Sequence, residues 1–96
     1  MKALIIMYSG ADRHRVPGVL DQHTVAGYTE LTRAHGAGIT GRREETRAWP
    51  GDTTVYFSVM DDSRIPEILA ALRADAAALP PGERLHVAMV PVEQFF

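Results

Sequence analysis

The sequence has no cysteine, and neither sign of charge prevails: ten lysines and arginines stand against twelve aspartates and glutamates, a formal net charge of -2. Without cysteine the chain forms no disulfides and no thiolate metal sites, which suits a reducing compartment, so we expect a cytoplasmic protein. The charge balance lacks the positive excess that draws proteins onto nucleic acid or anionic lipid, and we expect neither partner. The apolar run at residues 3–7 is too short for a signal sequence or a membrane span, so we expect no membrane insertion.

The apolar content that the sequence does have is that of a small globular domain. Hydrophobic residues make up 46% of the 96 positions, which supports one hydrophobic core. The sequence therefore predicts a single domain over residues 1–96. A domain of this size buries only about two-thirds of the surface that its unfolded chain exposes, so we expect association with further copies to add burial.

Four segments have the residue pattern of β-strands: residues 2–8, 27–33, 53–60 and 84–92. The first and third are apolar on both alternating registers, with Phe57 on one side of the third segment and Tyr56 and Ser58 on the other. A strand has this pattern when both faces of its sheet are covered. One layer of helices covers only one face, so we expect the second face to meet another subunit.

Two helices are predicted between these strands. Apolar residues recur at three- and four-residue steps up to Leu79, with Ser63 as the expected N-cap and Pro66 in the first turn. A shorter helix is predicted over residues 17–24, where Pro17 is tolerated in a first turn. The order strand, helix, strand, strand, helix, strand predicts an α+β fold of the ferredoxin-like βαββαβ type, in which two helices back a four-stranded antiparallel sheet.

The connection over residues 34–52 lacks apolar periodicity and is long for a loop inside a compact domain. Loops of this length often carry function. Its glycines permit close approach of a ligand, and its arginines supply donors that suit phosphates or carboxylates: Gly36, Gly38, Arg42, Arg43 and Arg47. Glutamates stand between these arginines, which is also typical of a solvated face, and the residues leave both interpretations open.

Three parts of the chain together carry a family resemblance. They are residues 25–29 (VAGYT), residues 35–38 (HGAG) with residues 46–51 (TRAWPG), and the ending at residues 90–94 (VPVEQ). In these parts the chain resembles the PII-like signalling proteins, relatives of nitrogen regulatory protein P-II, and in particular a branch with an HGxG stretch and a Trp-Pro-Gly before the third strand. The resemblance covers most of the chain.

The resemblance implies a ferredoxin-like subunit that assembles into a homotrimer and binds small-molecule effectors in clefts between neighbouring subunits. It implies that the loop of residues 34–52, the T-loop of the family, reports occupancy to a protein partner, a transporter or an enzyme. By position, Gly27, Tyr28 and Thr29 match the segment that lines an adenine pocket from one subunit, and His35, Gly36 and Gly38 match the segment that faces it. The expected effector is an adenine nucleotide or another small anion.

The chain departs from the family pattern before the last strand. PII proteins carry a glycine-rich phosphate-binding loop with a lysine at this place, whereas residues 79–84 here read LPPGER. The loop of residues 34–52 also contains no tyrosine, so we expect no uridylylation there. The missing phosphate loop leaves more of the binding to the glycines and arginines of residues 34–52, or favours an effector smaller than ATP.

Two other classes of function are open alternatives. A metal-responsive or efflux-associated accessory protein would use His35 as a ligand, although the four histidines show none of the short paired spacings of a preformed zinc or copper site. A small cofactor-free ferredoxin-like enzyme would place a histidine or carboxylate in an apolar cavity. The chain pairs no nucleophile with a base at a recognisable spacing, so we expect a regulator and not an enzyme.

Overall fold

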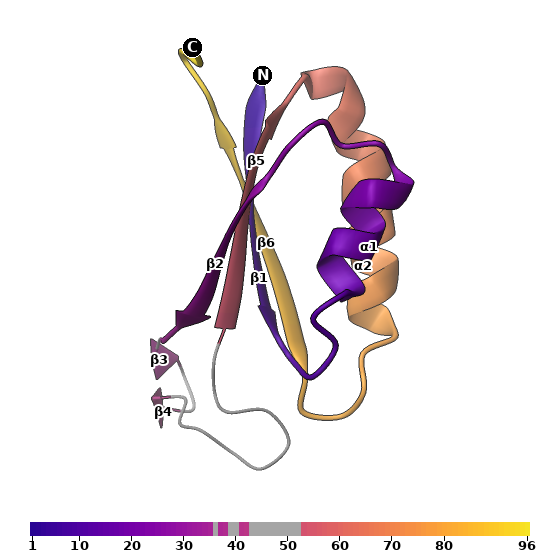
Figure 1. The fold of residues 1–96 in the computed structure, drawn as a ribbon, viewed down its shortest axis with the longest axis vertical. Coiled ribbons are helices and arrows are strands. Elements are labelled where there is room, and N and C mark those ends of the chain that lie inside the picture. Colours follow the sequence, from indigo (N-terminus) through magenta and orange to yellow (C-terminus); the bar gives the residue numbers. More distant parts are fainter. Residues whose placement is uncertain (36, 39–40, 43–52) are drawn as a thin grey trace.

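A four-stranded antiparallel sheet with two helices on one face forms the body of the fold (Figure 1). The computed structural model describes residues 1–35, 37–38, 41–42 and 53–96. The sheet has the order β2-β5-β1-β6, and its elements are β1 (Lys2–Ser9), α1 (Arg15–Gln22), β2 (Thr29–Ala34), β5 (Thr53–Met60), α2 (Ile65–Ala77) and β6 (Arg84–Pro91). The structure confirms the ferredoxin-like α+β fold predicted from the sequence.

Two further strands lie within the stretch that the sequence predicts as one long loop. β3 (Ala37–Gly38) pairs antiparallel with β4 (Gly41–Arg42) to form a separate two-stranded sheet. Ala34, the predicted first residue of the loop, is the last residue of β2. The stretch predicted as a loop, from about residue 34 to residue 52, therefore contains a pair of two-residue strands, because such pairing depends on the partner segment and leaves little trace in so short a sequence.

The hydrophobic core lies between the sheet and the helices. Alternate residues of β1 and β5 point into it, and the register sets Ile6 of β1 beside Tyr56 of β5, both buried. The two helices contribute apolar side chains from their inner faces. The largest fully buried side chains come from all four of these elements: Tyr56, Leu4, Ile6, Leu20, Ile68, Leu72 and Val16.

The ends of the helices differ from the prediction. α1 begins two residues earlier than predicted and ends at Gln22, because Thr24 adopts a left-handed backbone conformation with a φ of 52° that stops the helix. Before α2, Ser63 lies inside a short 3₁₀ turn, η1 (Asp62–Arg64), and no side chain caps the helix with a hydrogen bond. The prediction of Ser63 as N-cap is wrong, whereas Pro66 does occupy the first turn.

Strand β2 is shorter and less regular than predicted. It begins at Thr29, two residues later than expected, and its register with β5 shifts between Leu31 and Ala34. Arg33 inside this shift has a φ of 60°, which a bulge can impose on a residue other than glycine. The simple alternation of faces therefore holds only up to the bulge.

The face of the sheet opposite the helices carries apolar side chains. Phe57 lies beside Ile5 and Thr29 in the register and is 38% exposed, and Leu31 and Val90 on the same face are 51% and 39% exposed. Within the described ranges no helix covers this face (Figure 1). An apolar sheet surface of this kind is typical of an interaction site, which agrees with the expectation that it meets another subunit.

Candidate functional site

The candidate residues fall into two groups at opposite ends of β2. Gly27 and Tyr28 precede the strand and Thr29 opens it, whereas His35 follows it. β2 has six residues, and a strand rises about 3.3 Å per residue, so about 20 Å separates the two groups. One copy of the chain does not bring them to the same small ligand.

The second group lies partly outside the described residues. Gly38 belongs to β3 and Arg42 to β4, so the small hairpin positions both beyond the end of β2 where His35 lies exposed. Gly36, Arg43 and Arg47 lie outside the described residues, as does the Trp-Pro-Gly sequence of residues 49–51.

The first group is anchored by side chains of β5. The Ser58 hydroxyl donates a hydrogen bond of 2.7 Å to the carbonyl oxygen of Gly27. The ring of Tyr28 packs edge-on against the ring of Tyr56, with centroids 6.0 Å apart and an interplanar angle of 65°. Tyr28 keeps 37% of its surface exposed. The segment is therefore anchored on β5, and part of the Tyr28 side chain is accessible to solvent.

Gly27 itself has free space around it. A Cβ built at this position would meet no atom within 4 Å, and its backbone is outside the left-handed region. Folding therefore does not require glycine at this position. A close approach of a ligand to the backbone is one reason for glycine to stand here.

Tyr56 is the buried support of this region. Its side chain is 1% exposed, and Glu30 lies opposite it in the register of the neighbouring strand. Burial raises the pKa of Tyr56, and the negative charge of Glu30 raises it further, so the hydroxyl stays protonated. The sequence predicts Tyr56 and Ser58 on one side of the strand but does not predict their role. The signal was a polar residue, Ser58, on the face that packs against helices.

A second polar cluster, which sequence reasoning missed, ties the start of β6 to the end of β1. The Tyr8 hydroxyl donates a 2.7 Å hydrogen bond to Glu83 and accepts one of 3.1 Å from the Asp12 amide. The other Glu83 oxygen accepts from the Ala11 amide at 3.2 Å. Burial raises the pKa of Tyr8, and the hydrogen bond to Glu83 raises it further. PII proteins carry a phosphate-binding lysine at this place. This chain has instead the Glu83 carboxylate, which accepts hydrogen bonds from the Tyr8 hydroxyl and the Ala11 amide.

The described part of the chain contains no preformed metal site. No group of three or more histidine, aspartate or glutamate side chains gathers there in a way that could hold an ion. His35 makes a contact within the chain.

In the same described ranges, no helix has the length and apolar character needed to cross a bilayer.

Solved structures with the same arrangement of elements include PII-like proteins. CPII, a nitrogen regulatory PII-like protein from Thiomonas intermedia K12 bound to ADP, AMP and bicarbonate, is 21% identical, and the match covers 97% of this chain and 88% of CPII with a TM-score of 0.69. The apo form of CPII is 19% identical, with coverages of 95% and 89% and a TM-score of 0.64. A DUF3240 family protein from Shewanella baltica OS155 is 13% identical, with coverages of 99% and 93% and a TM-score of 0.71.

These matches narrow the ferredoxin-like fold to the fold of PII-like proteins. They extend over almost the whole chain, including both helices and all four strands of the main sheet. No protein-family model matches the chain, and no curated protein sequence matches it. The structural neighbours show that the chain has the fold that the sequence resemblance to PII-like proteins predicts.

Proposed function

We propose that this protein is a cytoplasmic PII-like regulator that binds an adenine nucleotide or a small anion such as bicarbonate between neighbouring copies of the chain. It signals occupancy to a partner protein through the loop of residues 34–52. The observation that carries this proposal is the fold shared over 97% of the chain with CPII, a nitrogen regulatory protein whose structure holds ADP, AMP and bicarbonate.

The separation of the two candidate groups supports a site between copies of the chain. Because they lie at opposite ends of β2, a site that uses both needs Gly27 to Thr29 from one copy and His35 with Gly38 from the next. Such head-to-tail contacts use two different surfaces of each copy, and they form a ring when the rotation between copies closes. The uncovered apolar face, with Phe57 near its centre, provides the surface that such a ring would bury. We propose a homotrimer.

The ligand contacts follow from the chemistry at each end of the strand. The exposed part of the Tyr28 ring offers an aromatic surface to a base, and the open space at Gly27 allows the ligand to reach the backbone. At the other end, Arg42 and the further loop arginines, Arg43 and Arg47, supply donors for phosphate or carboxylate oxygens. Glu83 adds a negative charge instead of a phosphate ligand at the start of β6, which favours an effector with fewer phosphates than ATP.

Gly27→Val tests this proposal. The substitution adds a side chain where the structure has room for it, so the subunit is expected to fold, while the side chain occupies the surface proposed for the ligand. For the wild type, titration with AMP, ADP, ATP and bicarbonate by calorimetry and thermal shift is expected to show binding. A ligand at a hundred times its Kd stabilises the folded state by about 2.7 kcal/mol.

Gly18→Ala is the matched control. Gly18 is also exposed and also has no atom within 4 Å of a built Cβ, but it lies on α1, away from both candidate groups. We expect the control to bind nucleotide like the wild type and Gly27→Val to bind at least tenfold more weakly. If the wild type binds none of the four ligands, or if Gly27→Val binds them as well as Gly18→Ala does, the proposed site is wrong.

A further inference from the structure

The segment between α1 and β2 is held at several points although it has no regular secondary structure. It runs from His23 to Tyr28 and carries Gly27 and Tyr28 of the first candidate group. The amide of Val25 donates to the carbonyl of Leu20 at 2.9 Å, and the Val25 side chain packs against the core. The amides of His23 and Thr24 still bond to carbonyls of α1, and beyond them the segment owes its shape to contacts with other elements.

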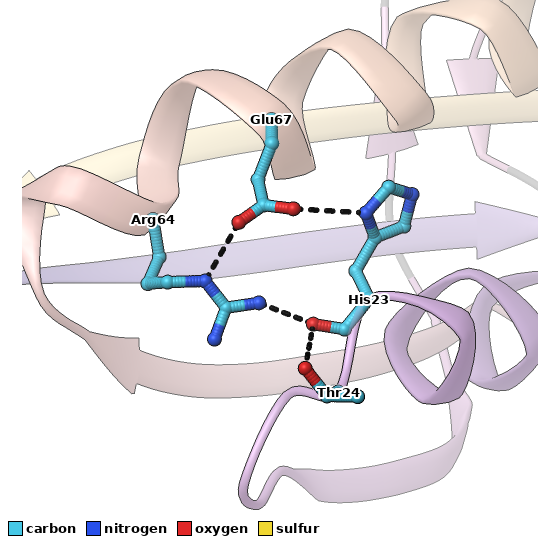
Figure 2. A network of polar contacts seen from close by, with 4 residues as sticks. All are labelled: His23, Thr24, Arg64 and Glu67. Atoms are coloured by element: carbon cyan, nitrogen blue, oxygen red, sulfur yellow. Dashed lines mark hydrogen bonds and ion pairs between the residues drawn. The ribbon is translucent and has the colours of Figure 1, made fainter.

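The start of the segment is tied to the beginning of α2 by a network of polar contacts (Figure 2). Arg64 Nε donates to Glu67 Oε1 at 2.7 Å, and Arg64 Nη2 donates to the carbonyl oxygen of His23. His23 Nδ1 lies 3.1 Å from the other oxygen of Glu67, and the Thr24 hydroxyl donates to the His23 carbonyl at 2.7 Å. Both the side chain and the backbone of His23 are therefore fixed against α2.

The far part of the segment is held by a buried hydroxyl. Ser58 is 3% exposed, and its Oγ donates to the Gly27 carbonyl at 2.7 Å. Ser58 points to the helix side of β5, opposite to the apolar face with Phe57, so its contact is separate from the surface proposed for assembly. The Ser58 hydroxyl gives the Gly27 carbonyl a hydrogen-bond partner and ties it to β5.

We propose that Ser58 and Arg64 are positioning residues that hold the segment from His23 to Tyr28 in its ligand-ready shape, through Gly27 and His23 respectively. The inference rests on the proposed function, because it assigns a purpose to the anchors of a proposed ligand segment. Neither side chain touches the ligand; both reduce the ordering that the segment must undergo when the ligand binds.

Ser58→Ala and Arg64→Met are the test variants. The alanine removes the hydroxyl and leaves the strand, and the methionine keeps an apolar stem while it removes the guanidinium. Amide hydrogen exchange of the unliganded protein is expected to accelerate at least tenfold within residues 23–29 and to stay unchanged in β1. Calorimetry with AMP and ADP is expected to show about fivefold weaker binding for Ser58→Ala, which is what the loss of one hydrogen bond implies.

Ser9→Ala and Ser58→Thr are the controls. Ser9 is 4% exposed and shares a 2.8 Å hydrogen bond with Thr53. Ser9→Ala therefore removes a buried, hydrogen-bonded hydroxyl, as Ser58→Ala does, but at the opposite end of the sheet. Ser9→Ala is expected to lower the stability without faster exchange in residues 23–29, and Ser58→Thr, which keeps the hydroxyl, is expected to retain slow exchange and affinity. These readouts separate positioning from a general loss of stability.

The outcomes also separate this inference from the proposed function. If the wild type binds nucleotide and Ser58→Ala binds it equally well with unchanged exchange, the positioning role is wrong and the proposed function stands. If exchange in residues 23–29 accelerates as much in Ser9→Ala as in Ser58→Ala, the anchor is not specific and the inference is overturned. If the wild type binds no nucleotide and no bicarbonate, both fall together.

Discussion

Replacing Phe57 with alanine or aspartate tests whether the uncovered face of the sheet joins copies of the chain. Phe57 is 38% exposed, and its neighbours in the register, Ile5 and Thr29, belong to the strands on either side of β5. The residue therefore lies within the sheet face and not at its edge. A contact with another copy that covers this face would bury what is left of the ring.

The exposed area gives the size of the effect. A phenylalanine side chain presents on the order of 200 Å², so an exposed fraction of 38% leaves roughly 75 Å² of apolar surface. At about 25 cal/mol per Å² this area contributes about 2 kcal/mol per copy, or about 6 kcal/mol for three copies that each bury it. The trimer of Phe57→Ala should be weaker by about four orders of magnitude in its dissociation constant. Phe57→Asp should abolish it, because a carboxylate would have to lose its water.

Sedimentation equilibrium and light scattering over a range of micromolar concentrations measure the assembly. Far-ultraviolet circular dichroism shows whether the separated subunits stay folded. Phe96→Asp is the matched control, because it makes the same chemical change at a fully exposed phenylalanine. A wild type that is monomeric at micromolar concentration, or a Phe57→Asp variant that assembles as the wild type and Phe96→Asp do, would refute the reasoning.

Two further perturbations probe the subunit itself. Gly10→Ala should lower the free energy of unfolding by about 1–3 kcal/mol in urea titrations, because its Cβ would overlap the Tyr8 hydroxyl and the Glu83 carboxylate; no loss would contradict this packing. The pKa of Glu67 is lowered by Arg64 first and then by His23, so the stabilisation by its carboxylate is complete above the unfolded pKa of about 4.3 and is lost as the pH falls through the lower folded value. The stability difference between wild type and Glu67→Gln should therefore shrink from pH 6 to pH 3, and a constant difference would speak against the network.

The elements that local pattern determines were predicted well. The bounds predicted for β5 agree with the structure, and the alternation that separates Tyr56 from Phe57 matches buried and exposed positions. Pro66 lies in the first turn of α2 as expected. Side-chain orientation repeats every two residues in a strand and every three to four residues in a helix. A short stretch of sequence therefore contains the whole pattern.

The features that the sequence did not predict are contacts between distant segments. Ser58 and Gly27 are 31 positions apart, and Tyr8 and Glu83 are 75 apart. Nothing in the local pattern of either segment names its partner, because the partner depends on how the strands and helices pack. The bulge near Arg33 has the same cause, because it depends on the register with β5 and not on the residues of β2 alone.

The sequence by itself determined the kind of fold and the two alternating sets of side chains along each strand, because this periodicity is a local property of the chain. It also supplied the residues of both candidate groups. Only the tertiary structure decided which set of side chains is buried and that the Ser58 hydroxyl binds the Gly27 carbonyl. These contacts join segments that lie far apart in the sequence, and they are set by packing and register, which no local pattern contains.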